Sequence, residues 1–121
     1  MFAPHNKVDN LICTVDVNGQ QIDGATDKIL NLLSLEAKFL AFGWDVMHAE
    51  GNNMDKIVAA LEEAKSRTGK GKPVIILMKT EMGNGVDFMM NTHAWHGKAP
   101  NDTQLENALA QNYNTGGELD Y

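Results

Sequence analysis

The chain lacks the features that would assign it to a nucleic-acid-binding, membrane-spanning or secreted class. Ten Lys and Arg are outnumbered by sixteen Asp and Glu, for a formal net charge of -6. This balance argues against a nucleic-acid or anionic-membrane surface, because both require clustered basic residues. No apolar run approaches the roughly 20 residues that span a bilayer, and the stretch Met1 to Lys7 carries Pro4 and polar residues where a signal peptide is apolar. These absences predict a cytoplasmic protein.

Cysteine is also scarce. Cys13 is the single cysteine, so no disulfide can form within the chain and a reducing compartment is the natural setting. Cys13 falls inside an apolar run, and no basic residue flanks it to favour its reaction. We therefore interpret it as a small core residue.

The residues that are present predict an α/β domain. A composition of 43% apolar and 21% charged residues over 121 residues is typical of a globular chain with one core. Short apolar runs bounded by turn-forming residues predict strands at residues 10–16 and 74–78, and a short, weakly alternating stretch predicts another at residues 44–49. The last run is apolar throughout, which is typical of a parallel strand covered on both faces.

Helical spacing separates these strands. It begins at Thr26, with Ser34 as an N-cap within the segment and Gly43 as its stop. A second helix is predicted from Met54 to Lys65, capped by Asn53. Its predicted apolar stripe consists of Ile57, Val58, Leu61 and Ala64. A last helix is predicted from about residue 101, followed by a flexible tail over residues 112–121. Strands alternating with helices predict a parallel sheet.

Two segments carry candidate functional residues. Asp16 to Gly24 follows a buried strand and turns at Gly19, which is how a parallel strand presents polar groups at its carboxyl end. Taken alone, its Asp-x-Asn-Gly pattern is more often a plain turn. Trp95 to Asp102 contains His96, whose imidazole suits phosphate contact and proton transfer near neutral pH. Taken alone, a histidine beside a tryptophan more often packs and makes one hydrogen bond.

Other candidate motifs do not support a site. The glycine-punctuated stretch Thr80 to Gly85 lacks the lysine and the Ser or Thr of a phosphate-binding P-loop. We interpret it as a loop leading towards His96, with glycines for tight backbone geometry. His93 is left out of the predicted site.

Read together, Asp16 to Gly24 and Trp95 to Asp102 resemble transketolase. The similarity runs from about Lys7 to Asp102. The string from Lys98 to Asp102 (Lys-Ala-Pro-Asn-Asp) resembles the separate amino-terminal subunit of transketolases that are split over two chains. Another thiamine diphosphate enzyme, such as a deoxyxylulose-phosphate synthase, fits the Trp-His-Gly-Lys-Ala-Pro string less well.

The resemblance implies a fold, a reaction and a set of site residues. It implies a thiamine diphosphate-binding domain and the transfer of two-carbon ketol units between sugar phosphates, as in the pentose phosphate pathway. The side-chain oxygen of Asn18 and the backbone carbonyl of Gln20 would bind Mg²⁺ or Ca²⁺ at the cofactor's diphosphate. Ile22 would pack near the thiazolium ring, and His96 would contact the diphosphate and handle protons at the substrate.

The resemblance also implies missing parts. The family's Gly-Asp-Gly metal motif lies upstream of the matching asparagine, and no such string precedes Asn18. We therefore expect residues 1–121 to form a single incomplete domain, a partial doubly wound and mostly parallel sheet without its leading strands. We expect it to be truncated, inactive alone and oligomeric, with a carboxyl-terminal subunit supplying the pyrimidine-binding domain. The alternative is a non-catalytic remnant or interaction module that pairs through an exposed sheet edge.

Overall fold

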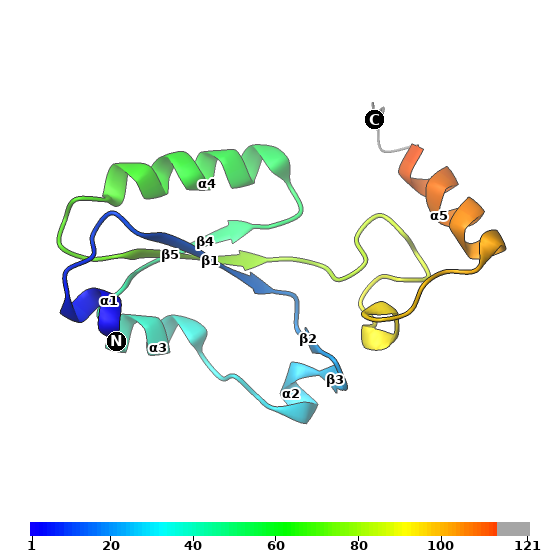
Figure 1. Cartoon of the computed structure of the whole chain (residues 1–121), viewed down its shortest axis with the longest axis horizontal. Helices are drawn as coiled ribbons and strands as arrows, with labels where there is room; N and C mark the ends of the chain where they lie inside the picture. The colour runs from blue at the N-terminus through cyan, green and yellow to red at the C-terminus, as the bar shows by residue number, and fades with distance from the viewer. Residues whose placement is uncertain (114–121) are drawn as a thin grey trace. The chain divides into compact units, whose positions relative to one another are not determined.

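The computed structural model describes residues 1–113 and contains the α/β fold predicted from the sequence (Figure 1). The chain divides into two compact units. The sheet unit comprises Met1–Asn18 and Asn31–Thr80, and the loop unit comprises Gly19–Leu30 and the described chain from Glu81 onwards. A single incomplete domain over residues 1–121 stays a prediction.

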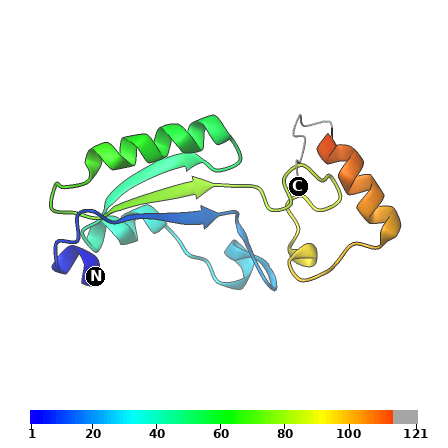
Figure 2. The same cartoon turned by 45° about the horizontal axis from the view of Figure 1, so that its top comes forward.

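Three parallel strands form the centre of the sheet unit. They are β1 (Ile12–Val17), β4 (Asp45–Glu50) and β5 (Val74–Lys79), in the order β1-β5-β4. Each lies within one or two residues of its predicted place, so the strand predictions are confirmed. The run from Val74 to Leu77 is buried because β5 is paired along both edges and covered on both faces. Helix α4 (Met54–Arg67) lies on one face of the sheet and α3 (Leu35–Ala41) on the other (Figures 1 and 2).

The core lies between the sheet and α4. Its buried members are Met47, Ala60, Ala64, Val74 and Ile76. The small side chains of Ala60 and Ala64 allow the helix to approach the strands closely. The predicted stripe on α4 was wrong at Val58, which is 52% exposed. One residue turns a helix by about 100°, so Val58 points away from the face that carries Ile57, Leu61 and Ala64.

The helical segment predicted from Thr26 to Gly43 is interrupted. It forms α2 (Thr26–Ile29) and α3, and residues 30–34 between them are not helical. Asn31 accounts for the break, because its Oδ1 accepts a 2.7 Å hydrogen bond from the backbone N–H of Leu33, which has a left-handed φ of 51°. Ser34 caps α3 as predicted, accepting a 3.0 Å bond from the backbone N–H of Ala37.

The N-terminus of α4 carries the second predicted cap. Asn53 Oδ1 accepts a 3.1 Å hydrogen bond from the backbone N–H of Lys56. This bond satisfies one of the amide groups that have no partner within the helix. At the other end, Arg67 donates to Glu63 at 2.5 Å and to Asp45 at 3.0 Å. The pKa of Arg67 lies above its ordinary value, chiefly because of the hydrogen bond to Glu63.

Replacing Asn53 with alanine is expected to lower the free energy of unfolding by about 1 kcal/mol, because the cap of α4 is lost. The control Asn53→Asp keeps an acceptor oxygen at the positive end of the helix dipole and should unfold close to the wild type. Urea unfolding followed by circular dichroism measures both variants. Equal midpoints for the alanine variant and the wild type would show that the cap does not stabilise the helix.

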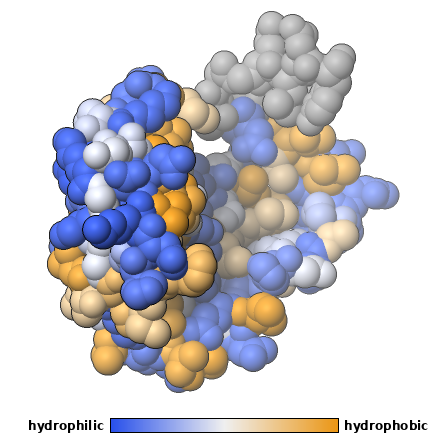
Figure 3. Space-filling view, turned by 60° about the vertical axis from the view of Figure 1, so that its left-hand side comes forward, coloured by the Kyte–Doolittle hydropathy of each residue, from blue (hydrophilic) through white to orange (hydrophobic). Residues whose placement is uncertain are grey.

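Several large apolar side chains of the sheet unit remain exposed. They include Phe2 of α1 (Phe2–His5) and Leu33, at 80% and 77% exposure, and Leu40 and Phe42 at 53% and 47%. Figure 3 shows apolar residues, in orange, among hydrophilic ones on the face that it views. Leu33 and Leu40, although they have helical spacing from Thr26 onwards in the sequence, are therefore not part of a buried helix face within residues 1–113.

The loop unit contains short elements and one longer helix. A two-residue antiparallel ladder joins β2 (Gln20–Gln21) to β3 (Gly24–Ala25), and the 3₁₀-helix η1 (His93–Trp95) precedes α5 (Asp102–Tyr113). The last helix thus begins where it was predicted, and it takes in residues 112 and 113 of the predicted tail. The rest of that tail, residues 114–121, lies outside the described residues.

Side-chain contacts hold the segments of the loop unit together. Gln111 of α5 accepts a 2.8 Å bond from the backbone N–H of Asp87 and donates a 2.9 Å bond to its carboxylate. The rings of Phe88 and Trp95 meet edge to face at a centroid distance of 5.2 Å. These contacts give the segment that precedes His96 a defined conformation.

Candidate functional site

Polar groups gather at the carboxyl edge of the three-stranded sheet. Asp16 lies near the end of β1 and Asn18 directly follows it, while Thr80 directly follows β5. The strands are parallel and Val17 is the register partner of Lys79, so β1 and β5 end side by side. The carboxyl edge of a parallel sheet is the usual position of a ligand site in α/β proteins.

The side chain of Asn18 has a defined orientation. Its Nδ2 donates a 3.2 Å hydrogen bond to Oδ2 of Asp16. An ionised carboxylate can only accept, so the amide nitrogen faces Asp16 and the amide oxygen lies on the opposite side of the Asn18 side chain. Amide oxygens are among the ligands that hard divalent cations prefer.

The turn after Asn18 leads into the loop unit. Gly19 has a φ of 72°, a conformation that glycine adopts without strain. Its carbonyl accepts from Thr26, at 3.0 Å from the backbone N–H and 3.3 Å from Oγ1. Gln20 follows directly in β2, so the two predicted cation-binding residues flank one glycine. Ile22 lies in the two-residue connection between β2 and β3 and is 71% exposed.

His96 lies at the end of η1 in the loop unit. Its backbone N–H donates a 3.0 Å bond to the carbonyl of His93, and its side chain is exposed. At the other end of η1, Thr92 Oγ1 accepts a 3.3 Å bond from the backbone N–H of Ala94. The predicted site residues thus divide between the units, because Asn18 belongs to the sheet unit whereas Gln20, Ile22 and His96 belong to the loop unit.

Within residues 1–113, no group of three or more His, Cys, Asp or Glu side chains is arranged to hold a metal ion. The side-chain oxygen of Asn18 and the backbone carbonyl of Gln20, the two predicted cation ligands, are of the donor type that Mg²⁺ and Ca²⁺ prefer.

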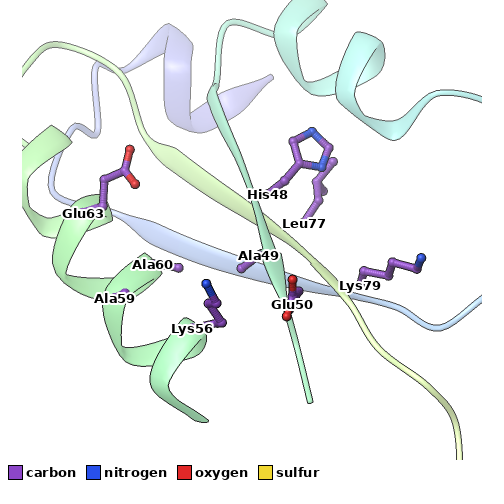
Figure 4. Close-up of a pocket in the computed structure, with 9 residues that line it drawn as sticks. All are labelled: His48, Ala49, Glu50, Lys56, Ala59, Ala60, Glu63, Leu77 and Lys79. Carbon is purple, nitrogen blue, oxygen red and sulfur yellow. The ribbon is translucent and has the colours of Figure 1, made fainter. Parts of the chain in front are cut away.

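A cavity of about 490 Å³ in the sheet unit is lined by none of the predicted site residues. Figure 4 shows its lining, which consists of His48, Ala49, Glu50, Lys56, Ala59, Ala60, Glu63, Leu77 and Lys79. Two of its ionisable groups already have partners, since His48 lies 3.4 Å from Glu36 and Glu63 accepts from Arg67. Acidic and basic groups are mixed in this lining, so its charges do not point to a ligand class.

Thr80 was missed by sequence reasoning. Its hydroxyl donates to Oδ1 of Asp16, 64 residues away in the chain, and its backbone N–H donates to the carbonyl of Val17 at 3.3 Å. A pairing of this kind is visible in the sequence only once β1 and β5 are known to be parallel neighbours in register. The available signal was a polar residue directly after each apolar run.

Residues 1–115 match the family model described as transketolase, thiamine diphosphate binding domain. The chain is 40% identical over 111 residues to the 6-deoxy-6-sulfo-D-fructose transketolase subunit SqwG of Clostridium sp. (strain MSTE9), with 92% of this chain and 40% of that protein covered. It is 34% identical over 111 residues to one subunit of the apulose-4-phosphate transketolase of Phocaeicola vulgatus, with 92% and 39% covered.

A solved structure shares the fold. The crystal structure of transketolase from Campylobacter jejuni superposes with a TM-score of 0.80 and 29% identity, with 91% of this chain and 17% of that chain covered. The chain thus spans about two fifths of the length of the curated relatives named above. Within residues 1–113, no helix has both the length and the apolar character needed to cross a membrane.

Proposed function

Because the chain belongs to the transketolase family of thiamine diphosphate-binding domains, we propose that it binds the diphosphate end of this cofactor together with a divalent cation. It would do so as a component of an enzyme that transfers two-carbon ketol units between sugar phosphates. The observation that carries the proposal is the oriented Asn18 amide at the carboxyl end of β1, within a family match over residues 1–115.

The residues at the turn after β1 offer oxygen atoms of the kind that bind a divalent cation. Asn18 would give its side-chain oxygen, and Gln20 its backbone carbonyl, to Mg²⁺ or Ca²⁺. These are two of the six or more oxygens that such an ion takes, and phosphate, water and groups outside these 121 residues would supply the others. When bound, thiamine diphosphate supplies the carbon nucleophile of the reaction, and the cation neutralises the diphosphate.

Two further residues would act near the cofactor. Ile22 is large, apolar and 71% exposed, so it could bury its surface against a ring system at little conformational cost. His96 would donate a hydrogen bond to the diphosphate and hold or move a proton at the substrate's hydroxyl groups. An exposed imidazole on a short, capped element suits both roles.

The remaining parts of the site would come from outside these residues. Both relatives described above are named as transketolase subunits. We propose that a companion carboxyl-terminal subunit supplies the pyrimidine-binding domain, that the active species is an oligomer, and that the 121 residues alone do not turn over substrate. A cytoplasmic location belongs to the same proposal, supported by the single cysteine.

A second candidate function is an interaction module without catalysis. It is favoured by the position of β1, which within residues 1–113 lies at the edge of the three-stranded sheet. A strand at an edge can pair with a further strand. Such a module would bind a partner chain and would not bind the cofactor, so one titration separates the two candidates.

Titration calorimetry of the full chain with thiamine diphosphate and Mg²⁺, in the presence and absence of the companion subunit, tests the proposal. Binding is expected for the wild type and should weaken at least about tenfold in Asn18→Ala, because a cation-binding oxygen is lost. Asn10→Ala, at an exposed position before β1, is the matched control and should bind like the wild type. A folded wild-type chain that gives no heat with the companion present would exclude the proposed function and favour the interaction module.

A further inference from the structure

The Asp16 carboxylate joins two strand ends at the predicted cation site. One of its oxygens accepts the 3.2 Å bond from Asn18 Nδ2, and the other accepts a hydrogen bond from the hydroxyl of Thr80. All three residues belong to the sheet unit. The Asn18 amide is thus bonded to Asp16, and Asp16 in turn to Thr80.

Gly51 provides the space in which Thr80 sits. It directly follows β4, and its backbone N–H donates a 2.7 Å bond to the carbonyl of Lys79. A Cβ atom built on Gly51 would collide with Cγ2 of Thr80 and would come within 3.1 Å of Cβ of Met78. Gly51 is not among the glycines with positive φ, so the requirement at this position is for space rather than for an unusual backbone conformation.

We propose that Asp16 and Thr80 are positioning residues that hold the Asn18 amide with its oxygen presented to the cation, and that Gly51 keeps Thr80 in place. Gly51 follows β4 and packs against Thr80, which follows β5. Thr80 is bonded to Asp16 of β1, and Asp16 is bonded to Asn18. This inference rests on the proposed cation-binding function. It adds three residues to the site that act through Asn18 and need not touch the ion.

The physical reason is the conformational entropy that is lost when a metal-binding side chain is ordered. An asparagine side chain rotates about two bonds and can present either its oxygen or its nitrogen to a cation. If the side chain is mobile before binding, the entropy lost on ordering it lowers the affinity of the site for the cation. A carboxylate that accepts from Nδ2 selects the productive orientation beforehand. Groups that orient metal ligands in this way typically contribute about 10- to 100-fold to metal affinity.

The Thr80 variants separate the hydroxyl from the shape of the side chain. Thr80→Val keeps the branched shape and loses the donor, so the Kd for Mg²⁺ in the presence of thiamine diphosphate should rise about tenfold. Thr80→Ser keeps the donor and should remain within about twofold of the wild type. Asp16→Ala removes the acceptor itself and should raise the same Kd by up to about 100-fold. Calorimetry on the full chain with its companion subunit measures all three.

The Gly51 variants test the packing step. Gly51→Ala should weaken Mg²⁺ binding about as much as Thr80→Val, because the new methyl group displaces Thr80. The double variant Gly51→Ala/Thr80→Ser removes the colliding Cγ2 and keeps the hydroxyl, so most of the affinity should return. A double variant as weak as Gly51→Ala alone would show that Thr80 does not transmit the effect.

A measurement without any ligand separates this inference from the proposed function. In the free, isotopically labelled chain, the Asn18 side-chain amide should be ordered in NMR relaxation experiments and should fall below an order parameter of about 0.6 in Thr80→Val and Asp16→Ala. An Asn18 amide equally ordered in wild type and variants would overturn the inference, whatever the cofactor titration shows. An ordered amide in a wild type that binds no cofactor would instead contradict the proposed function.

Discussion

Shortening Ile76 to alanine is expected to lower the free energy of unfolding by about 2–5 kcal/mol, a large part of the 5–15 kcal/mol typical of a domain. Ile76 is fully buried in β5, which has a strand on each edge, and it belongs to the core cluster between the sheet and α4. Removing its outer carbons deletes buried apolar contacts and leaves a cavity, because a close-packed core relaxes only in part. Urea unfolding monitored by circular dichroism gives the change directly.

Val58→Ala is the matched control for Ile76. Val58 is also a β-branched apolar residue, but it is 52% exposed on the outer side of α4. Its truncation should change the free energy of unfolding by no more than about 0.5 kcal/mol, since alanine is also the better helix former. If Ile76→Ala and Val58→Ala had the same urea midpoint, the placement of the core between β5 and α4 would be wrong.

Replacing His96 with alanine in the assembled enzyme is expected to lower kcat by about 100- to 10,000-fold, the range over which general acid–base residues contribute. The loss follows from the proposed role of the imidazole in proton handling. The Kd for thiamine diphosphate should rise less, because one hydrogen bond to the diphosphate is removed while the cation-binding groups stay in place. Steady-state kinetics and a cofactor titration on the same preparation separate the two effects.

A second histidine provides the control for His96. His48 is exposed on β4 and lies 3.4 Å from Glu36, so His48→Ala removes only a surface pair. The kcat of the His48→Ala enzyme should stay within about twofold of the wild-type value. An unchanged kcat in His96→Ala would show that His96 is not a catalytic residue.

Local signals made much of the fold predictable from the sequence. The continuous apolar run of β5, the cap residues Ser34 and Asn53, and the amphipathic pattern of α4 act over a few residues, and each is confirmed except at Val58. The break over residues 30–34 was missed, because an Asn31 side chain that competes with the helix leaves no change in the hydrophobic pattern. The exposure of Val58 was missed because it depends on which face of α4 meets the sheet.

The candidate site was likewise predictable only where local sequence patterns determine it. The sequence placed Asn18 at the carboxyl end of a strand and Gln20 in the turn after it, because a buried strand followed by Asn-Gly is a local pattern. It could not reveal that Asp16 lies between Asn18 and Thr80, since that arrangement depends on two strands pairing in register. The roles of Asn18, Gln20, Ile22 and His96 at the cofactor stay predictions.

The central position of β5 also determines the order in which this sheet can assemble. β4, α4 and β5 are consecutive, and the partners in β4 and β5 are separated by only about 30 residues, whereas the partners in β1 and β5 are separated by about 60. Closing the longer loop costs more conformational entropy, and within residues 1–113 the added strand gains a partner on one edge only. We therefore expect the β4–α4–β5 unit to form first and β1 to join it last. Because Asn18 directly follows β1, its oriented amide would form only in this final step of folding, and ligand binding there would favour the fully assembled sheet by mass action.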